Sequence, residues 1–200
     1  MMDDICYEWE CRCSTADCQI GLALDTISEI WQKDVNNYIW IEPDGSVERI
    51  GAYLKELSPL DYDLPIVNEA LVAYFTQKIP VSTTINQCND LIKFQKVVKL
   101  SEKYDHVEHE RANIKERYSY KCYRVFASTD RNDGRLLKVK SGKRGEKFAN
   151  TPDHCFIDND DVTAAVCPDK LDKQWYVKLA IKRLEEFGIS CGRQQSLGLT

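Results

Sequence analysis

Residues 131–147 read RNDGRLLKVKSGKRGEK, and this stretch decides which fold class the sequence favours. Asn132-Asp133-Gly134 and Ser141-Gly142 are typical of turns, because these residue types tolerate the backbone angles that turns need. Between the two turns, apolar residues alternate with Lys138 and Lys140. This alternation has the period of a strand, so both lysines are expected on one strand face. The stretch therefore predicts a basic antiparallel β segment.

The segments on either side of this stretch complete the pattern of an α+β fold. The chain has β character over the whole range 104–147. Leu64–Gln77 carries apolar residues at helical spacing, with Pro65 in the first turn, where proline is tolerated. Leu171–Phe187 has the same spacing and is followed by Gly188, at the position of a helix C-cap glycine. We expect amphipathic helices and a β-hairpin, then a small basic antiparallel β meander and a C-terminal helix.

The N-terminal part of the chain contains the predicted hairpin. Apolar residues recur at helical spacing over residues 20–34, which predicts an amphipathic helix. Two β-prone runs, 38–41 and 47–54, flank Pro43-Asp44-Gly45. Such runs around an Asp-Gly turn predict a hairpin.

Shorter helices are expected after the first long one. The hydroxyl groups of residues 82–84 can cap the start of a short helix, and Asp90 can cap another that buries Leu91, Phe94, Val97 and Val98. We divide the chain into a poorly ordered, cysteine-containing leader (1–18), a segment with the hairpin and helices (19–100), and the basic meander with the closing helix (101–200).

The composition is that of an ordinary soluble globular protein. The chain has 200 residues, of which 43% are hydrophobic and 30% are charged. No apolar run reaches the ~18 residues that a membrane span needs. The N-terminal residues lack a basic region followed by an apolar one, so they predict no secretory signal. We therefore expect a cytoplasmic protein whose nine cysteines are free thiols.

The net charge of −5 hides an uneven distribution of charge along the chain. Residues 1–70 hold 15 acidic and 4 basic residues, a net charge of −11. Residues 71–200 hold 17 acidic and 23 basic residues, a net charge of +6. Within them, residues 111–147 have 12 bases and 4 acids, a net charge of +8. A basic block inside an acidic chain points to a local contact with a polyanion.

Phosphate groups of a nucleic-acid backbone are the polyanion that such a segment suits best, because they require only an array of mobile cations. A solvated strand face is the alternative interpretation. The candidate DNA-binding residues of the segment are Arg131, Arg135, Lys138, Lys140, Lys143, Arg144 and Lys147.

Two patterns of residues raise metal-binding hypotheses. The spacing Cys6-x4-Cys11-x-Cys13-x4-Cys18 departs from the paired knuckles of structural zinc sites, so unpaired thiols are the simpler interpretation. A magnesium-dependent nuclease is a further alternative. It would use His154, Asp158, Asp160 and Asp161.

Three short stretches resemble the C-terminal end of the palm and the thumb of phage-type family B DNA polymerases. They are residues 36–55 (with Asn36-Asn37-Tyr38-Ile39-Trp40-Ile41, Asp44-Gly45 and Arg49-Ile50-Gly51-Ala52-Tyr53-Leu54-Lys55), residues 58–68 (SPLDYDLPIVN) and residues 171–176 (LDKQWY). They occur in the same order as in the family and cover roughly residues 30–188. The resemblance implies that Tyr38 lies near the primer terminus and that Arg49 and Lys55 contact DNA. Asn36 stands where the family has a lysine.

The resemblance implies a catalytically inert fragment of a split or truncated polymerase, because the Asp-Thr-Asp motif that binds the catalytic metals does not occur in this chain. No residue is assigned a catalytic or metal-binding role. Mg²⁺ would act only if a separate palm or exonuclease chain supplied its site. The expected partner is primer–template duplex DNA, bound without sequence specificity. The alternative is a protein-interaction module of a phage or mobile element without DNA affinity.

Overall fold

A computed structural model describes residues 29–54, 64–112, 114–119, 122–158 and 166–189. The chain forms two compact units, residues 1–51 and residues 52–200. The division lies inside the predicted segment 19–100, and the predicted leader 1–18 lies outside the described residues.

The first unit contains a three-stranded antiparallel sheet in the order β1-β2-β3. Its strands are β1 (Glu29–Asp34), β2 (Asn37–Ile41) and β3 (Val47–Ile50). The hairpin of β2 and β3 confirms the prediction, and Gly45 in its turn has a φ of 85°. The predicted helix 20–34 is wrong over residues 29–34, which form β1. These residues pair with β2 in the register Ile30↔Trp40, and pairing along a neighbouring strand outweighs a weak helical periodicity.

The second unit contains the two long helices that the sequence predicted, one near its start and one near its end. Helix α3 (Pro65–Gln77) starts at the expected proline, and α5 (Lys173–Glu186) is followed by Gly188 with a φ of 75°. The Asp172 side chain caps α5 by accepting a hydrogen bond from the backbone of Trp175 at 3.2 Å. The rings of Phe75 and Phe187, with centroids 5.3 Å apart, join the two helices.

The two short helices differ in detail from the prediction. Helix α4 (Val81–Gln87) has Pro80 at its N-cap and no side-chain cap, so residues 82–84 lie inside the helix. Asp90 caps as predicted, accepting from the backbone of Ile92 at 3.2 Å. The helix that it caps is a single 3₁₀ turn, η1 (Leu91–Phe94), and Val97 and Val98 belong to the following strand.

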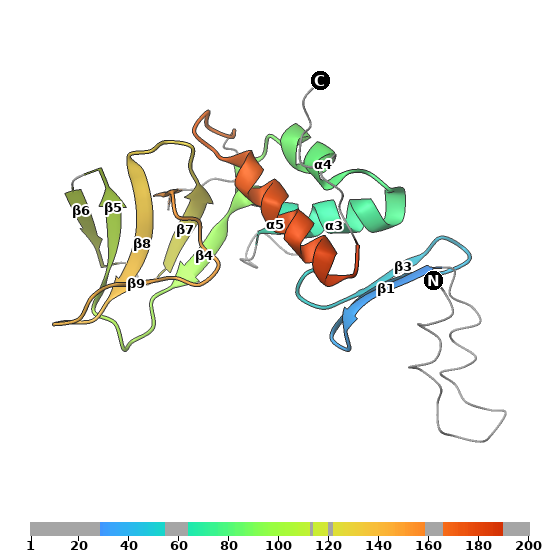
Figure 1. Cartoon of the computed structure of the whole chain (residues 1–200), viewed down its shortest axis with the longest axis horizontal. Helices are drawn as coiled ribbons and strands as arrows, with labels where there is room; N and C mark the ends of the chain where they lie inside the picture. The colour runs from blue at the N-terminus through green and yellow to red at the C-terminus, as the bar shows by residue number, and fades with distance from the viewer. Residues whose placement is uncertain (1–28, 55–63, 113, 120–121, 159–165, 190–200) are drawn as a thin grey trace, which may run out of the picture. The chain divides into compact units, whose positions relative to one another are not determined.

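Two antiparallel sheets form the other end of the second unit (Figure 1). The three-stranded sheet has the order β10 (Cys155–Ile157), β7 (Cys122–Ala127), β4 (Lys96–Lys99). The four-stranded sheet has the order β6 (Ile114–Tyr118), β5 (His106–Arg111), β8 (Asp133–Val139), β9 (Glu146–Lys147). The strand order departs from a simple meander, because β7 follows β6 in the chain but joins the other sheet.

The core of the sheet region draws buried residues from both sheets. It contains Val98, Val107, Tyr123, Val125, Leu136, Phe148 and Cys155. Burial of these side chains removes apolar surface from water, the main favourable contribution to folding. The architecture confirms the predicted α+β class with a C-terminal helix. In the described part of the chain, every helix is too short or too polar to cross a lipid bilayer.

Candidate nucleic-acid interface

The β8–β9 hairpin is the element that carries most of the predicted basic residues. Its strands pair through Leu137↔Lys147 and Lys138↔Glu146. The connecting turn forms at the predicted position: Gly142 has a φ of 72°, and the backbone N–H of Lys143 donates to the carbonyl of Lys140 at 2.9 Å. β9 is the edge strand of the four-stranded sheet, so this turn lies at the edge of the sheet.

Strand pairing distributes the predicted bases over two sheet faces. Lys147 lies opposite Leu137, so it shares a face with Arg135, two residues away along β8. Lys138 lies opposite Val107 on the other face, at the margin of the buried core. Lys140 follows the last residue of β8. The sequence alternation was therefore confirmed as a strand, but the bases of the strand do not form one array.

Three of the predicted bases are engaged by carboxylates of the second unit. Arg135 Nε lies 3.0 Å from Glu110 Oε2, and Lys147 Nζ lies 2.7 Å from Asp153 Oδ1. Lys138 Nζ lies 3.6 Å from Glu146 Oε2 and 4.8 Å from the centre of the Tyr104 ring. The Tyr104 hydroxyl, followed by Glu146, raises the pKa of Lys138. These cations already have anionic neighbours.

Four predicted bases are exposed and have no carboxylate partner among the described residues. They are Arg131, Lys140, Lys143 and Arg144. The last three lie within five residues at the β8–β9 turn, whereas Arg131 lies in the turn at the opposite end of β8. A strand of this length spans about 23 Å, so the cluster of free charge consists of Lys140, Lys143 and Arg144.

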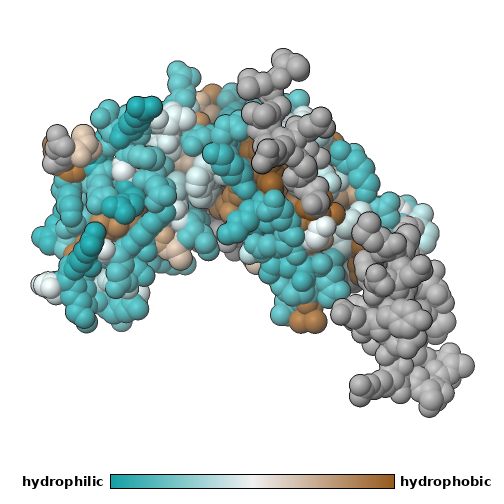
Figure 2. All heavy atoms as spheres, in the orientation of Figure 1, coloured by the Kyte–Doolittle hydropathy of each residue, from teal (hydrophilic) through white to brown (hydrophobic). Residues whose placement is uncertain are grey.

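Strand β6 adds two basic residues that the site prediction did not include. In the register of β5 and β6, Lys115 lies opposite Glu110 and Arg117 lies opposite Glu108. In the register of β5 and β8, Glu108 lies opposite Leu137. Both bases therefore share the sheet face of Arg135 and Lys147. Figure 2 shows mostly hydrophilic residues over this region of the second unit. Their alternation with Ile114, Glu116 and Tyr118 was the sequence signal that could have placed them together.

A chain of hydrogen bonds orders the bases of β6. Arg117 Nη2 donates to Nδ1 of His106 at 3.2 Å, so the other ring nitrogen, Nε2, carries the hydrogen. This Nε2–H donates to Glu108 at 3.3 Å, and Lys115 donates to the other oxygen of Glu108 at 3.3 Å. The hydrogen bond from His106 is the main cause that lowers the pKa of Glu108.

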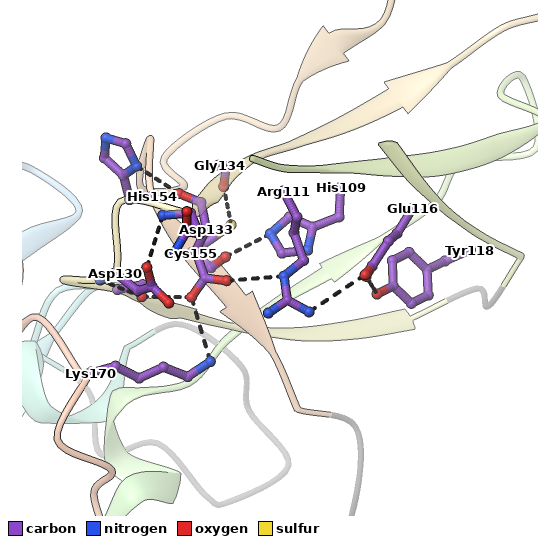
Figure 3. A network of polar contacts seen from close by, with 12 residues as sticks. His109, Arg111, Glu116, Tyr118, Asp130, Asp133, Gly134, His154, Cys155 and Lys170 are labelled. Carbon is purple, nitrogen blue, oxygen red and sulfur yellow. Dashed lines mark hydrogen bonds and ion pairs between the residues drawn. The ribbon is translucent and has the colours of Figure 1, made fainter. Parts of the chain in front are cut away.

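A separate polar network surrounds the buried carboxylate of Asp133 (Figure 3). Ser128 Oγ donates to Asp133 Oδ2 at 2.7 Å. Two cations approach the same carboxylate, Arg111 Nε at 3.4 Å and Lys170 Nζ at 3.5 Å. The His154 ring donates from Nδ1 to the backbone carbonyl of Asp133 at 2.7 Å. Asp133 thus joins β5, β8, the turn before β8 and the segment that leads into α5.

Two side chains near this network, His109 and Cys155, have pKa values that favour their neutral forms. His109 is buried, and its Nε2–H donates to the carbonyl of Cys155 at 2.7 Å. Desolvation is the main cause that lowers the pKa of His109, so its ring is neutral at physiological pH. The thiol of Cys155 donates to the carbonyl of Gly134 at 3.3 Å, and burial raises its pKa to about 12.

We expect the two cysteines of the sheet region to differ in reactivity. At about pH 8, iodoacetamide should modify the exposed Cys122 rapidly and leave Cys155 unmodified, because only a thiolate reacts and the pKa of Cys155 is about 12. Mass spectrometry of peptides measures both sites. Unfolding in urea is the control and should make the two rates similar. Equal rates in the folded chain would contradict the burial of Cys155.

The structure does not bring the two described residues of the alternative nuclease site, His154 and Asp158, close together. His154 and Asp158 flank the two ends of β10, about 13 Å apart along an extended chain. Asp160 and Asp161 lie outside the described residues, as do the N-terminal cysteines. Among the residues that the structure describes, no group of three or more His, Cys, Asp and Glu side chains is arranged to hold a metal.

The residues implied by the polymerase resemblance lie in or near the first unit. Tyr38 is half-buried and stacks on Trp40, with ring centroids 5.2 Å apart and an interplanar angle of 12°. Arg49 is exposed in β3, and Lys55 lies outside the described residues. Gly51 has a φ of 106°, and a Cβ atom there would collide with the backbone of Asn36. Glycine is therefore required at this position.

Comparison with known proteins yields no relative. Protein-family models, curated proteins and solved structures were each compared with the chain, and none of them matches. The polymerase resemblance therefore stays a prediction.

Proposed function

We propose that this chain binds the backbone of duplex DNA, without reading its base sequence, through the β8–β9 turn and the adjoining sheet face. The observation that carries the proposal is the cluster of exposed cations at Lys140, Lys143 and Arg144. These side chains have no carboxylate partner among the described residues. A cation without an ion-pair partner gains most from a phosphate, because it has no ion pair to give up.

The paired bases extend this surface. The pairs of Lys115, Arg135 and Lys147 are all solvent-exposed. Exposed pairs contribute only about 0–1 kcal/mol each, so their cations can also approach a phosphate. Contacts of this kind fix the position of a protein on the duplex and carry no sequence information.

The order of the polymerase-like stretches supports a more specific proposal, that the chain is a thumb-like fragment of a family B DNA polymerase. In this proposal the chain supplies the grip on primer–template DNA. A separate palm chain supplies the catalytic carboxylates and the Mg²⁺ that they bind.

Fluorescence anisotropy of labelled primer–template duplex, at several salt concentrations and with or without Mg²⁺, tests the proposal. We expect binding that needs no Mg²⁺ and weakens with salt, with a log–log slope of about −0.9 for each phosphate contacted. Absence of binding at low salt would refute the proposal.

The matched control carries Lys178→Gln and Lys182→Gln, which remove two exposed lysines from α5, outside the proposed surface. This variant should bind the duplex like the unmodified chain. An equal loss of affinity in this control and in the charge-matched variant Lys140→Gln/Lys143→Gln would show that net charge, and not the proposed surface, drives binding.

The protein-interaction alternative is favoured by one observation, the internal pairing of Arg135, Lys138 and Lys147. Their carboxylate partners Glu110, Glu146 and Asp153 belong to the same unit. A surface whose charges are compensated in this way suits a protein partner better than a polyanion. Salt-insensitive folding together with no DNA affinity would support this alternative.

A further inference from the structure

A hollow lies on the sheet face beside the β8–β9 turn. Its volume is about 300 Å³, at the lower end of the ~300–1,000 Å³ range of small-molecule pockets. All four strands of the sheet or their connections contribute to it: β6, β5, β8, the turn and β9. The lining residues are Glu110, Lys115, Arg135, Leu137, Arg144, Gly145 and Lys147.

Gly145 lets the turn approach the sheet closely. A Cβ atom at this position would lie 3.1 Å from Cβ of Leu137 and 3.3 Å from Cγ2 of Val139. These separations are tighter than ordinary van der Waals contact, so a larger residue would push the turn away from the strand. The absence of a side chain keeps the neighbouring Arg144 at the wall of the hollow.

The hollow concentrates positive charge. Its walls carry four bases and one acid, Glu110, so the net charge of the lining is +3. Counting the neighbouring partners of Lys115 and Lys147, which are Glu108 and Asp153, the net charge is still +1. Fixed cations around a concave surface favour a compact anion.

The hollow also offers hydrogen-bond donors that have no partner among the described residues. Arg135 uses its Nε–H for Glu110 at 3.0 Å, and its two terminal amino groups have no partner among the described residues. Because Glu110 holds the guanidinium, little side-chain freedom is lost when those groups bind an anion. Arg144 contributes a second guanidinium without a described carboxylate partner.

We propose that this hollow binds a phosphomonoester group. Such a group carries a charge of about −1.5 to −2 at neutral pH and three acceptor oxygens, which match the positive charge and the guanidinium donors. A phosphodiester group of the DNA backbone, by contrast, carries one negative charge and is bonded to a nucleoside on each side. The group can come from the phosphorylated end of a DNA strand or from a free phosphorylated small molecule. The proposal that the phosphate belongs to a DNA strand end rests on the proposed function, whereas the proposal of a free small molecule does not.

Titration of the ¹⁵N-labelled chain with inorganic phosphate tests the site directly by NMR. We expect the backbone N–H of Gly145 and the Nε–H of Arg135 to shift with phosphate, and not with chloride at equal ionic strength. Arg135→Gln should weaken phosphate binding about tenfold, as expected for one charge-assisted hydrogen-bonding group. The control Lys182→Gln should leave the titration unchanged. Equal shifts with both anions, or an unchanged titration in Arg135→Gln, would overturn the proposal.

Two further arms identify the source of the phosphate. Tighter binding of a 5′-phosphorylated duplex than of a 5′-hydroxyl duplex supports a strand end. Binding of thymidine 5′-monophosphate without such a preference supports a small molecule.

One variant separates this proposal from the proposed function. Lys140 and Lys143 do not line the hollow. Lys140→Gln/Lys143→Gln should therefore lose duplex affinity and keep the phosphate-induced shifts. Phosphate binding without any duplex binding would refute the proposed function alone. Duplex binding without phosphate-induced shifts would overturn the phosphomonoester site alone.

Discussion

Replacing Lys140, Lys143 and Arg144 together by glutamine is expected to weaken duplex DNA binding by about two orders of magnitude at ~0.1 M salt. The three side chains are exposed and lack carboxylate partners among the described residues, so each is free to displace a counterion from DNA. Removing three phosphate contacts should make the slope of log K against log salt shallower by about 2.7. Anisotropy titrations at several salt concentrations measure both quantities.

A single change at Lys138 provides the contrast within the same hairpin. Its ammonium group lies 3.6 Å from Glu146 and 4.8 Å from the Tyr104 ring centre. Lys138→Gln should therefore change the slope of log K against log salt by much less than one third of the change that the triple variant causes. A larger effect from Lys138 than from the turn residues would contradict the division between paired and free cations.

Replacing Asp133 by alanine is expected to lower the free energy of unfolding of the second unit by about 3 kcal/mol. The carboxylate is buried, and it accepts a hydrogen bond from Ser128 at 2.7 Å. Its loss leaves Ser128 without this acceptor and leaves Arg111 and Lys170 without a shared anion. Because both cations are partly exposed and can be hydrated, the expected loss lies at the low end of the range for buried pairs.

Urea denaturation followed by far-ultraviolet circular dichroism measures this loss. The matched control is Asp153→Ala, which removes an exposed carboxylate that pairs with Lys147. It should cost no more than about 0.5 kcal/mol. If Asp133→Ala fails to fold, Asp133→Asn keeps the oxygen that accepts from Ser128 and should show an intermediate loss. Equal stability of the Asp133 and Asp153 variants would contradict the role of the buried network.

Local signals in the sequence were enough for several elements of the fold. Pro65 and Gly188 mark helix ends as predicted, because these signals depend on residues close together in the chain. The Asp44-Gly45 hairpin turn and the Ser141-Gly142 turn also formed at the predicted positions. In each case, the residues that determine the backbone geometry are the residues that adopt it.

The same local reasoning failed where pairing partners decide the structure. Residues 20–34 show apolar spacing that suits a helix, but residues 29–34 form β1 because β2 offers a strand to pair with. Residues 122–127 lie between β6 and β8 in the chain, yet they form the central strand of the other sheet. Neither choice can be read from a short window, since each depends on contacts that only the assembled core provides.

The basic block around residues 111–147 was determined by the sequence alone, because charge is a property of the residues themselves. Tertiary structure decided which of these charges are free. Arg135 is paired because β5 places Glu110 beside it, 25 residues away. The side chains of Lys140, Lys143 and Arg144 have no ion-pair partner among the described residues, and the carboxylate that reaches their turn, that of Asp105, accepts from the backbone N–H of Ser141. Pairing of β6 with β5 brought Lys115 to the same face and completed the hollow. Strand register sets these neighbours, and register is fixed by burial of the whole sheet face.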